Sequence, residues 1–479
     1  MPQNLRIGKL VGMNNEIRDI LDNFVFTTIN QDFNYFEDFQ GIPIANQNFY
    51  LNELFNYQKY QIKDSDKFYQ SDVFRNILKD REIPECIPWP NALDSEKKLI
   101  LQMTLHPGRH HFDRMKTLFF DKILTDKVVH RLQNKTMYLF LYFGFEADSF
   151  SSDEFYTFGK YKNYYEMFDS IFDEYNLPKN SIIILSSNCL GKEQEKSYYQ
   201  GTENKLATIF DNVYEAKTFT EVKGDVNLDY TFDDYIKNVK NCNLKMLRTS
   251  RTQHYLRDIM LYWLTNSKNL DTTLVEQNKF YNNDLFWNKL GEIKKLAYDK
   301  NYTNKHLFDF NKTLMNRIEN SLPLVASDYE KSTPVPKDRI YSNEVIPHDI
   351  YTKTMFSWVS TSIPDRFTQV FINSSTFNPI LYYHPLAWNG NPYTVESFKK
   401  DGFKSYDFLF DETYDNIEWD IERLFLSILD IERVLSIPKK DLIDILIENK
   451  DVMEHNRNLL FECKSVTRII KKLHNYICE

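Results

Sequence analysis

Short apolar runs and longer segments of helical periodicity follow one another along the first half of the chain. Three of these runs have the length of buried strands: 99–105, 137–143 and 181–185. Helical patterns follow the first two runs, at 112–123 and at 161–175. Strands that alternate with helices predict a parallel sheet covered by helices. We therefore expect a Rossmann-like domain over residues 1–238, with residues 1–97 as an irregular lead-in.

The second half repeats the pattern. A short apolar strand at 244–247 precedes a segment whose apolar residues recur with the period of a helix, namely Leu256, Ile259, Met260, Trp263 and Leu264. Apolar runs then alternate with small polar loops between 354 and 415, and helical patterns occupy 439–447 and 452–476. We expect a second Rossmann-like α/β domain over residues 239–479 with a helical C-terminus.

Length and composition narrow the classes of protein. A chain of 479 residues is long enough for two domains with separate cores. Its 12 glycines include no G-x-G-x-x-G or Walker-type loop. The net charge of −9 disfavours a polyanionic partner, because a duplex-binding protein displaces counterions with a basic face.

The cysteines and the lengths of the apolar runs indicate whether the chain binds metal, crosses a membrane or lies in a reducing compartment. Five scattered cysteines without a C-x-x-C pair predict neither a disulfide framework nor a zinc site, and they favour a reducing compartment. No apolar run approaches 18 residues. We expect no membrane insertion, a cytoplasmic location and no bound metal.

The turn after the strand at 99–105 carries candidate acceptor-side residues. It contains His106, Arg109 and His111 before a helical segment. Residues that follow a strand of a parallel sheet face the ligand crevice, so these three would supply a general base or a charge clamp. Adjacent histidines such as His110 and His111 diverge, which disfavours a metal site. The competing interpretation is a loop with ordinary surface histidines.

A second candidate turn follows the strand at 244–247. It contains Arg248, Arg251 and His254 directly before the periodic helix. A helix N-terminus offers free N–H groups and a partial positive charge, and arginines beside it would complete a site for a diphosphate. The competing interpretation is a solvated helix face, because Arg251 and His254 lie away from the apolar stripe.

The stretch from 354 to 415 resembles a known family. Its motifs are Thr376-Phe377-Asn378-Pro379-Ile380, His384-Pro385-Leu386, Gly390, Gly402-Phe403 and Asp411-Glu412-Thr413-Tyr414-Asp415. In this order and spacing they resemble the donor-binding half of phage and marine-microbe glycosyltransferase-like proteins of the GT-B type. The resemblance implies two Rossmann-like domains facing each other across a cleft, and a C-terminal helix that crosses back to the first domain.

The resemblance also implies a function and a site. It implies transfer of a sugar from a nucleotide sugar to a glycan or other hydroxyl acceptor, with no metal or other cofactor. The implied donor-binding residues are Arg248, Arg251, His254, Ser374, Ser375, Thr376, His384 and Gly390. A hydroxymethylated base of phage DNA is a competing acceptor. If the chain is phage-encoded, its expected location is the cytoplasm of the host cell.

The chain departs from the family pattern in the same pocket. Ser374 and Ser375 stand where the family has a Glu-Lys pair, and Ser360-Thr361-Ser362 stands where relatives tend to have Thr-Glu-Thr. Either the donor is held differently or the activity is altered, and a non-catalytic binding or assembly protein of the same fold is a further alternative.

Three acidic residues are interpreted separately. Asp415 is interpreted first as an N-cap of the helix that starts at Ile417, and second as a catalytic acid. Glu146 and Glu344 are lone acids that would serve as general bases.

Overall fold

A computed structural model describes residues 24–28, 91–105, 115–143, 160–211, 230–250, 254–277, 280, 283–321, 348–360, 370, 372, 374–462 and 464–478. The chain divides into two compact units. Unit 1 comprises Met1–Val213 together with Lys464–Glu479, and unit 2 comprises Tyr214–Cys463. The boundary between the two units therefore lies near residue 213 rather than at residue 238. Helix α10 (Phe232–Asn241) belongs to unit 2, because it packs against helices of that unit.

Unit 1 contains a five-stranded parallel sheet in the order β1-β2-β3-β4-β5. Its strands are β1 (Phe24–Thr28), β2 (Lys98–Leu105), β3 (Met137–Phe143), β4 (Ile182–Ser186) and β5 (Ala207–Phe210). Strands β2, β3 and β4 confirm the three expected strands. The parallel sheets of this unit and of unit 2 confirm the α/β fold class.

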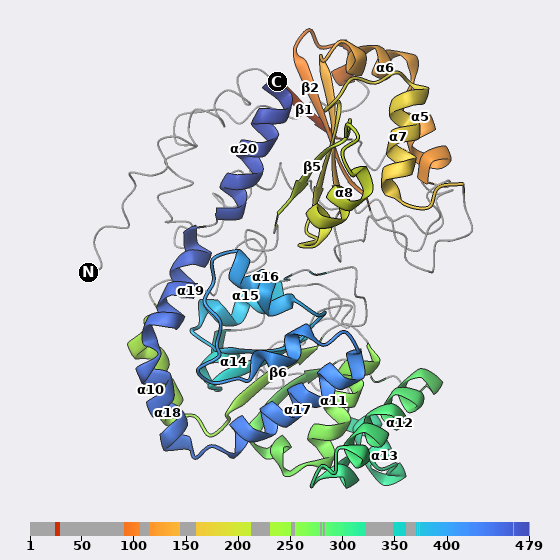
Figure 1. The fold of residues 1–479 in the computed structure, drawn as a ribbon. Coiled ribbons are helices and arrows are strands. Elements are labelled where there is room, and N and C mark those ends of the chain that lie inside the picture. The colour runs from red at the N-terminus through yellow and green to blue at the C-terminus, as the bar shows by residue number, and fades with distance from the viewer. Residues whose placement is uncertain are drawn as a thin grey trace. The chain divides into compact units, whose positions relative to one another are not determined.

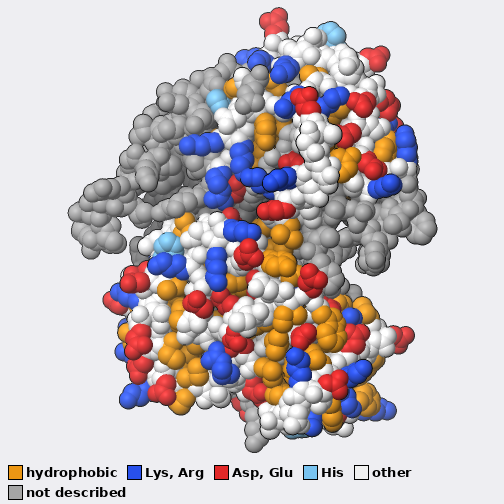
Figure 2. All heavy atoms as spheres, in the orientation of Figure 1, with side chains coloured by type: hydrophobic (Ala, Val, Ile, Leu, Met, Phe, Trp, Pro, Cys, Tyr) orange, Lys and Arg blue, Asp and Glu red, His pale blue; other side chains and the backbone are white. Residues whose placement is uncertain are grey.

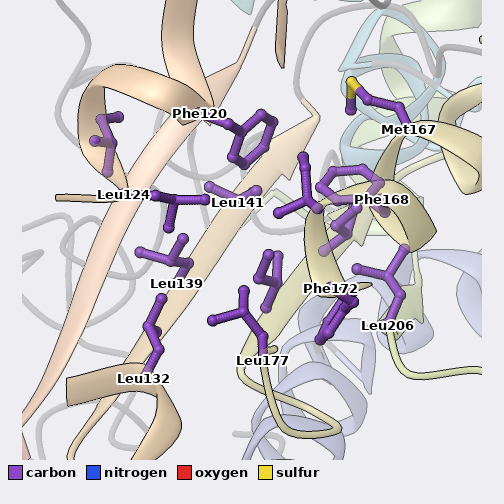
Figure 3. Close-up of a cluster of buried hydrophobic side chains, with 14 of the residues drawn as sticks. Phe120, Leu124, Leu132, Leu139, Leu141, Met167, Phe168, Phe172, Leu177 and Leu206 are labelled. Carbon is purple, nitrogen blue, oxygen red and sulfur yellow. The ribbon is translucent and has the colours of Figure 1, made fainter. Parts of the chain in front are cut away.

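Helices cover both faces of the unit 1 sheet. The helical segments between its strands are η3 (Asn91–Asp94), η4 (Lys116–Phe120), α5 (Asp121–Ile123), α6 (Asp126–Gln133), α7 (Tyr164–Glu174) and α8 (Gly191–Tyr199). Leu139 and Leu141 of β3 point into a buried apolar cluster with Leu132 of α6 and Phe168 of α7 (Figure 3). Figure 1 shows α5, α6 and α7 on one side of the sheet and the C-terminal helix α20 (Lys464–Cys478) on the other.

Helix α20 is held on unit 1 by hydrogen bonds and charge. Tyr138 precedes Leu139 on β3, so its side chain points to the opposite face of the sheet. Its hydroxyl donates to the carbonyl of Ile477 at 3.1 Å. At the end of β5, the carboxylate of Asp211 accepts from Arg468 at 2.6 Å and from Lys472 at 3.3 Å. The last helix of the chain thus belongs to unit 1.

Unit 2 contains a four-stranded parallel sheet in the order β7-β6-β8-β9. Its strands are β6 (Met246–Ser250), β7 (Thr273–Gln277), β8 (Phe356–Ser360) and β9 (Leu386–Asn389). The chain moves from β6 to β7 on one side and then returns past β6 to β8 on the other. In parallel α/β sheets such a reversal marks the place, at the carboxyl ends of the two central strands, where ligands bind.

The helices of unit 2 form more than one layer. Besides α10 they are α11 (Tyr255–Asn266), η6 (Lys268–Thr272), α12 (Asp284–Asp299), η7 (Lys305–Phe308), α13 (Lys312–Ser321), α14 (His348–Thr352), α15 (Ser374–Leu381), α16 (Thr394–Lys400), η10 (Glu412–Asn416), α17 (Asp420–Ser436), α18 (Lys439–Glu448) and α19 (Lys450–Glu462). Every residue of α11 from Tyr255 to Leu264 is buried. The predicted apolar stripe of α11 faces the core, and α12 and α13 cover its remaining surface.

Replacing glycine with alanine is expected to have opposite effects on stability at two helical positions. A Cβ on Gly191, the first residue of α8, would lie 2.1 Å from the ring of Phe210, whereas a Cβ on Gly291 within α12 would meet no atom within 4 Å. We expect Gly191→Ala to lower the free energy of unfolding by about 1–3 kcal/mol through overpacking. Gly291→Ala should raise it by about 0.5–1 kcal/mol, because alanine restricts the unfolded chain.

Urea unfolding followed by circular dichroism compares the two glycine variants directly. Each serves as the control for the other, since both add one methyl group at a helical position. Equal effects of the two substitutions would contradict the close approach of α8 to Phe210.

Candidate functional site

A layer of buried polar side chains crosses the carboxyl edge of the unit 2 sheet. Three of its residues end their strands, one lies within β6, and two belong to the first turn of α11. The members of this polar layer, with their exposed fractions, are Arg248 (1%), Arg257 (4%), Asp258 (0%), Gln277 (2%), Ser360 (5%) and Asn389 (2%). All four strands and α11 therefore contribute to one polar cluster.

Arg248 closes a ring of hydrogen bonds that joins three elements. Its guanidinium donates to Oε1 of Gln277 at 2.7 Å and to the main-chain oxygen of Arg257 at 2.6 Å. The side-chain amide of Gln277 then donates to Oδ1 of Asp258 at 2.5 Å. The carboxyl ends of β6 and β7 are thereby tied to the first turn of α11.

The side chain of Arg257 reaches the next strand of the sheet. Its Nε donates to Oγ of Ser360 at 3.3 Å, and its Nη2 donates to the carbonyl of Ser360 at 3.1 Å. The amide of Asn389, at the end of β9, lies 3.5 Å from the same Oγ and donates to the sulfur of Met260 in α11. Arg257 thus links α11 to the end of β8, at the point where the strand order reverses.

Burial governs the electrostatics of the polar layer. Removal from water lowers the pKa of Arg248 to about 9, and the nearby Asp258 opposes this shift. The guanidinium remains charged at neutral pH, and its Nε makes no hydrogen bond within the described part of the chain. Buried charges are costly unless they are paired and hydrogen-bonded. A ligand-binding role would account for placing two arginines here, at the edge where α/β sheets bind ligands.

The residues predicted in the turn before α11 fall in different places. Arg248 belongs to the polar layer but lies beneath α11 rather than at its surface. His254 is the N-cap of α11, where Nδ1 accepts from the backbone N–H of Leu256 at 3.3 Å and the ring lies against that of Tyr255. Arg251 lies outside the described residues. In the structure His254 therefore caps α11, and Arg248 binds β7 and the main chain of α11, while a phosphate contact of this turn stays a prediction.

The residues predicted after β8 and β9 lie at the carboxyl edge. Ser374, Ser375 and Thr376 open α15, and Thr376 is buried. Gly390 directly follows β9, and its carbonyl accepts from Nε of Arg423 in α17 at 2.7 Å. The first turn of α17 is thereby anchored at the same edge as the polar layer.

His384 lies at the opposite edge of the sheet. It precedes β9, and its Nδ1 accepts from the hydroxyl of Ser357, near the start of β8, at 2.9 Å. Its Nε2 donates to the carbonyl of Tyr351 at 2.8 Å, and complete burial lowers the pKa of the imidazole to about 4. His384 was predicted as a donor-binding residue. Because it lies at the amino ends of the strands, the structure separates it from Gly390 and from the polar layer.

The acidic motif at 411–415 has structural partners. The carboxylate of Asp415 accepts from the backbone N–H of Val395 at 3.0 Å and of Glu396 at 3.1 Å. It therefore caps α16, and not the helix after Ile417 that was expected. Asp411 caps η10 by accepting from the backbone N–H of Thr413 at 3.0 Å. These contacts favour the structural interpretation of the motif over a catalytic one.

A shallow pocket lies beside this motif. It has a volume of about 530 Å³ and is lined by Lys399, residues 407–413 and Arg433. Lys399 pairs with Glu412, and Arg433 pairs with Asp430. Both cations of the lining are therefore already paired with carboxylates, and the pocket shares no residue with the polar layer.

The acceptor-side residues predicted in unit 1, His106, Arg109 and His111, lie outside the described residues, as do Glu146 and, in unit 2, Glu344. The strand before the three predicted residues, β2, ends at Leu105 in the parallel sheet, as expected. Among the described ranges, no three His, Cys, Asp or Glu side chains form a group able to hold a metal ion. Of the helices that the structure describes, none is both long and apolar enough to traverse a bilayer.

Four members of the polar layer were not predicted: Arg257, Asp258, Gln277 and Asn389. One signal was present, because Arg257 and Asp258 interrupt an otherwise apolar helix between Leu256 and Ile259. A comparison with models of protein families finds no match for the chain, and no curated protein matches it. The fold and the polar layer are therefore the observations on which a function is proposed.

Proposed function

We propose that the chain is a glycosyltransferase that moves a sugar from a nucleotide-sugar donor to a hydroxyl acceptor, a glycan in the first instance, without a metal. The observation that carries the proposal is the pair of buried arginines, Arg248 and Arg257, at the carboxyl edge of the unit 2 sheet. Ligands of parallel α/β sheets bind at this edge, where the strand order reverses. The family resemblance in the stretch from 354 to 415 supports the same half as the donor-binding half.

In the proposed mechanism the protein stabilises the leaving diphosphate by charge and hydrogen bonds. Arg257 and the N-terminal amides of α11 would face the developing negative charge, which preorganised donors stabilise strongly in a site that excludes water. In unit 1, His106 or His111 would take the proton from the acceptor hydroxyl, and Arg109 would hold the acceptor. The two units would face each other across a cleft in the GT-B manner.

A second candidate function is a non-catalytic binding or assembly protein of the same fold. The observation that favours it is the way Arg248 and Asp258 use their hydrogen bonds inside the protein, with Gln277 and the main chain of Arg257. Ser374 and Ser375 also lack the charge of the Glu-Lys pair in the family pattern. In this alternative the polar layer only fixes α11 on the sheet.

Modified DNA is less favoured as an acceptor. Figure 2 shows cationic and acidic side chains mixed over the viewed face of unit 2. The net charge is −9. Non-specific attraction to a duplex needs a basic surface, and its strength falls steeply with salt. Glycosyl transfer onto hydroxymethylated and unmodified duplexes, beside a glycan acceptor, separates the two acceptor classes.

Calorimetric titration of the full chain with UDP-, GDP-, ADP-, TDP- and CMP-sugars tests the proposed function. We expect one nucleotide class to bind and the others to give no heat, because the donor half selects its base. Circular dichroism of the same sample shows that the protein is folded. A folded protein that binds none of the panel would overturn the transferase proposal and favour the binding protein.

A further inference from the structure

The two buried arginines of the polar layer hold different partners. The two terminal nitrogens of Arg248 donate to the side chain of Gln277 and to the main-chain oxygen of Arg257. Arg257 instead extends from α11 to the last residue of β8, where the strand order reverses. We propose that Arg257 contacts the diphosphate of the donor, and that Arg248 is a positioning residue that holds Arg257 in place. This inference rests on the proposed function.

The contact role falls to Arg257 because of where its side chain lies. Ser360 ends β8, and Nε and Nη2 of Arg257 both reach it, so the guanidinium sits at the carboxyl edge between the two central strands. An arginine presents five N–H donors in one plane, a geometry that matches phosphate oxygens. Asn389 approaches the same Ser360 hydroxyl from β9, so the buried polar layer continues from β8 to β9.

The positioning role of Arg248 follows from the closed ring around the peptide between Arg257 and Asp258. Arg248 binds the carbonyl of Arg257, while Gln277 binds both Arg248 and the carboxylate of Asp258. The turn is thus held from β6 through its backbone and from β7 through the side chain of Asp258. Loss of either tie would let the turn shift, and small displacements of a contact residue weaken binding strongly.

The ring also leaves one donor unused. The Nε–H of Arg248 is buried and makes no hydrogen bond with the described residues. Buried donors are normally paired, with protein atoms, water or a ligand. The unused donor lies on the guanidinium that ties down Arg257, so the polar layer retains capacity for an additional acceptor beside the proposed diphosphate contact.

Affinities of nucleoside diphosphates and of the matching nucleosides test the assignment. The pairs are UDP with uridine, GDP with guanosine, ADP with adenosine and TDP with thymidine, measured on the full chain. Their ratio isolates the contribution of the phosphates. Arg257→Lys should lower the affinity for the diphosphate by about 10- to 100-fold, because a hydrogen-bonded charge contact is lost. It should leave the affinity for the nucleoside unchanged.

Arg248→Lys should lower the diphosphate affinity by a smaller factor, about 3- to 10-fold, since only the geometry of Arg257 changes. In the variant that carries both substitutions, the loss should match that of Arg257→Lys alone, because residues that act through one another are not additive. Gln277→Asn, which opens the ring at its other link, replaces Arg248→Lys if that variant does not fold.

Arg457→Lys is the matched control. Arg457 is a buried arginine of unit 2 that binds the carbonyl of Leu381 and the hydroxyl of Tyr383, outside the polar layer. This control should leave both affinities unchanged. Equal weakening of diphosphate and nucleoside by Arg257→Lys, or additive losses in the double variant, would overturn the assignment while the proposed function stands. A wild-type chain that binds no member of either panel would overturn both.

Discussion

Replacing Asp258 with alanine is expected to lower the free energy of unfolding of unit 2 by about 3–5 kcal/mol, because removing one partner of a buried charge cluster leaves the others uncompensated. Asp258 is fully buried, accepts from Gln277 and lies close enough to Arg248 to raise its pKa. Without this carboxylate, Arg248 and Arg257 would repel each other in a medium that screens charge poorly.

Tryptophan fluorescence during urea unfolding measures this effect in unit 2, because five of the six tryptophans lie between residues 214 and 463. Asp258→Asn is the matched control, since it keeps an oxygen that accepts from Gln277 and removes only the charge. Its loss should be smaller, about 1–3 kcal/mol. An alanine variant within about 0.5 kcal/mol of the wild type, the range of ordinary surface substitutions, would show that the polar layer does not stabilise the fold.

Acidification from pH 6.5 to pH 4 is expected to remove about 3 kcal/mol of unfolding free energy through His384 alone. In the folded protein burial lowers the pKa of this imidazole to about 4, whereas in the unfolded chain the value is near 6.5. Between these values the unfolded state binds a proton that the folded state excludes. The stabilisation is therefore complete above pH 6.5 and is lost as the pH falls towards 4.

His384→Gln should flatten this part of the pH dependence. Glutamine cannot take up the proton, and its side-chain amide retains one donor for the carbonyl of Tyr351, which His384 binds at 2.8 Å. His130, an exposed residue at the end of α6 in unit 1, supplies the control substitution His130→Gln. If the wild type and His384→Gln lose stability in parallel between pH 6.5 and 4, His384 is not buried in its neutral form.

Much of the fold follows from local patterns in the sequence. The runs at 99–105, 137–143 and 181–185 are mostly apolar, as expected for strands with helices on both faces, and each forms a strand that is paired on both sides. Strand β7 was not predicted because Thr273–Gln277 carries two polar residues at its end. Those residues reflect the polar layer that β7 helps to form, which depends on neighbours distant in sequence.

The sequence predicted which loops and strand ends form the candidate site, but not which way their side chains point. The turn after β6 indicated Arg248, but sequence spacing does not show that its side chain turns inward to bind Gln277, which lies 29 residues away. His384 and Gly390 are close in sequence, yet a strand between them places them at opposite edges of the sheet. Short motifs therefore identified the strands and their loops, whereas side-chain contacts decided which residues share a site.

The central claim is that a nucleotide diphosphate binds at the carboxyl edge of the unit 2 sheet, between the ends of β6 and β8. A crystal of the full chain soaked with whichever nucleotide sugar binds in solution tests this claim most directly. We predict density for the two phosphates within hydrogen-bond distance of Arg257 and the first turn of α11. Density for the nucleotide elsewhere, for example in the pocket lined by Lys399 and Arg433, with an unchanged polar layer, would contradict it.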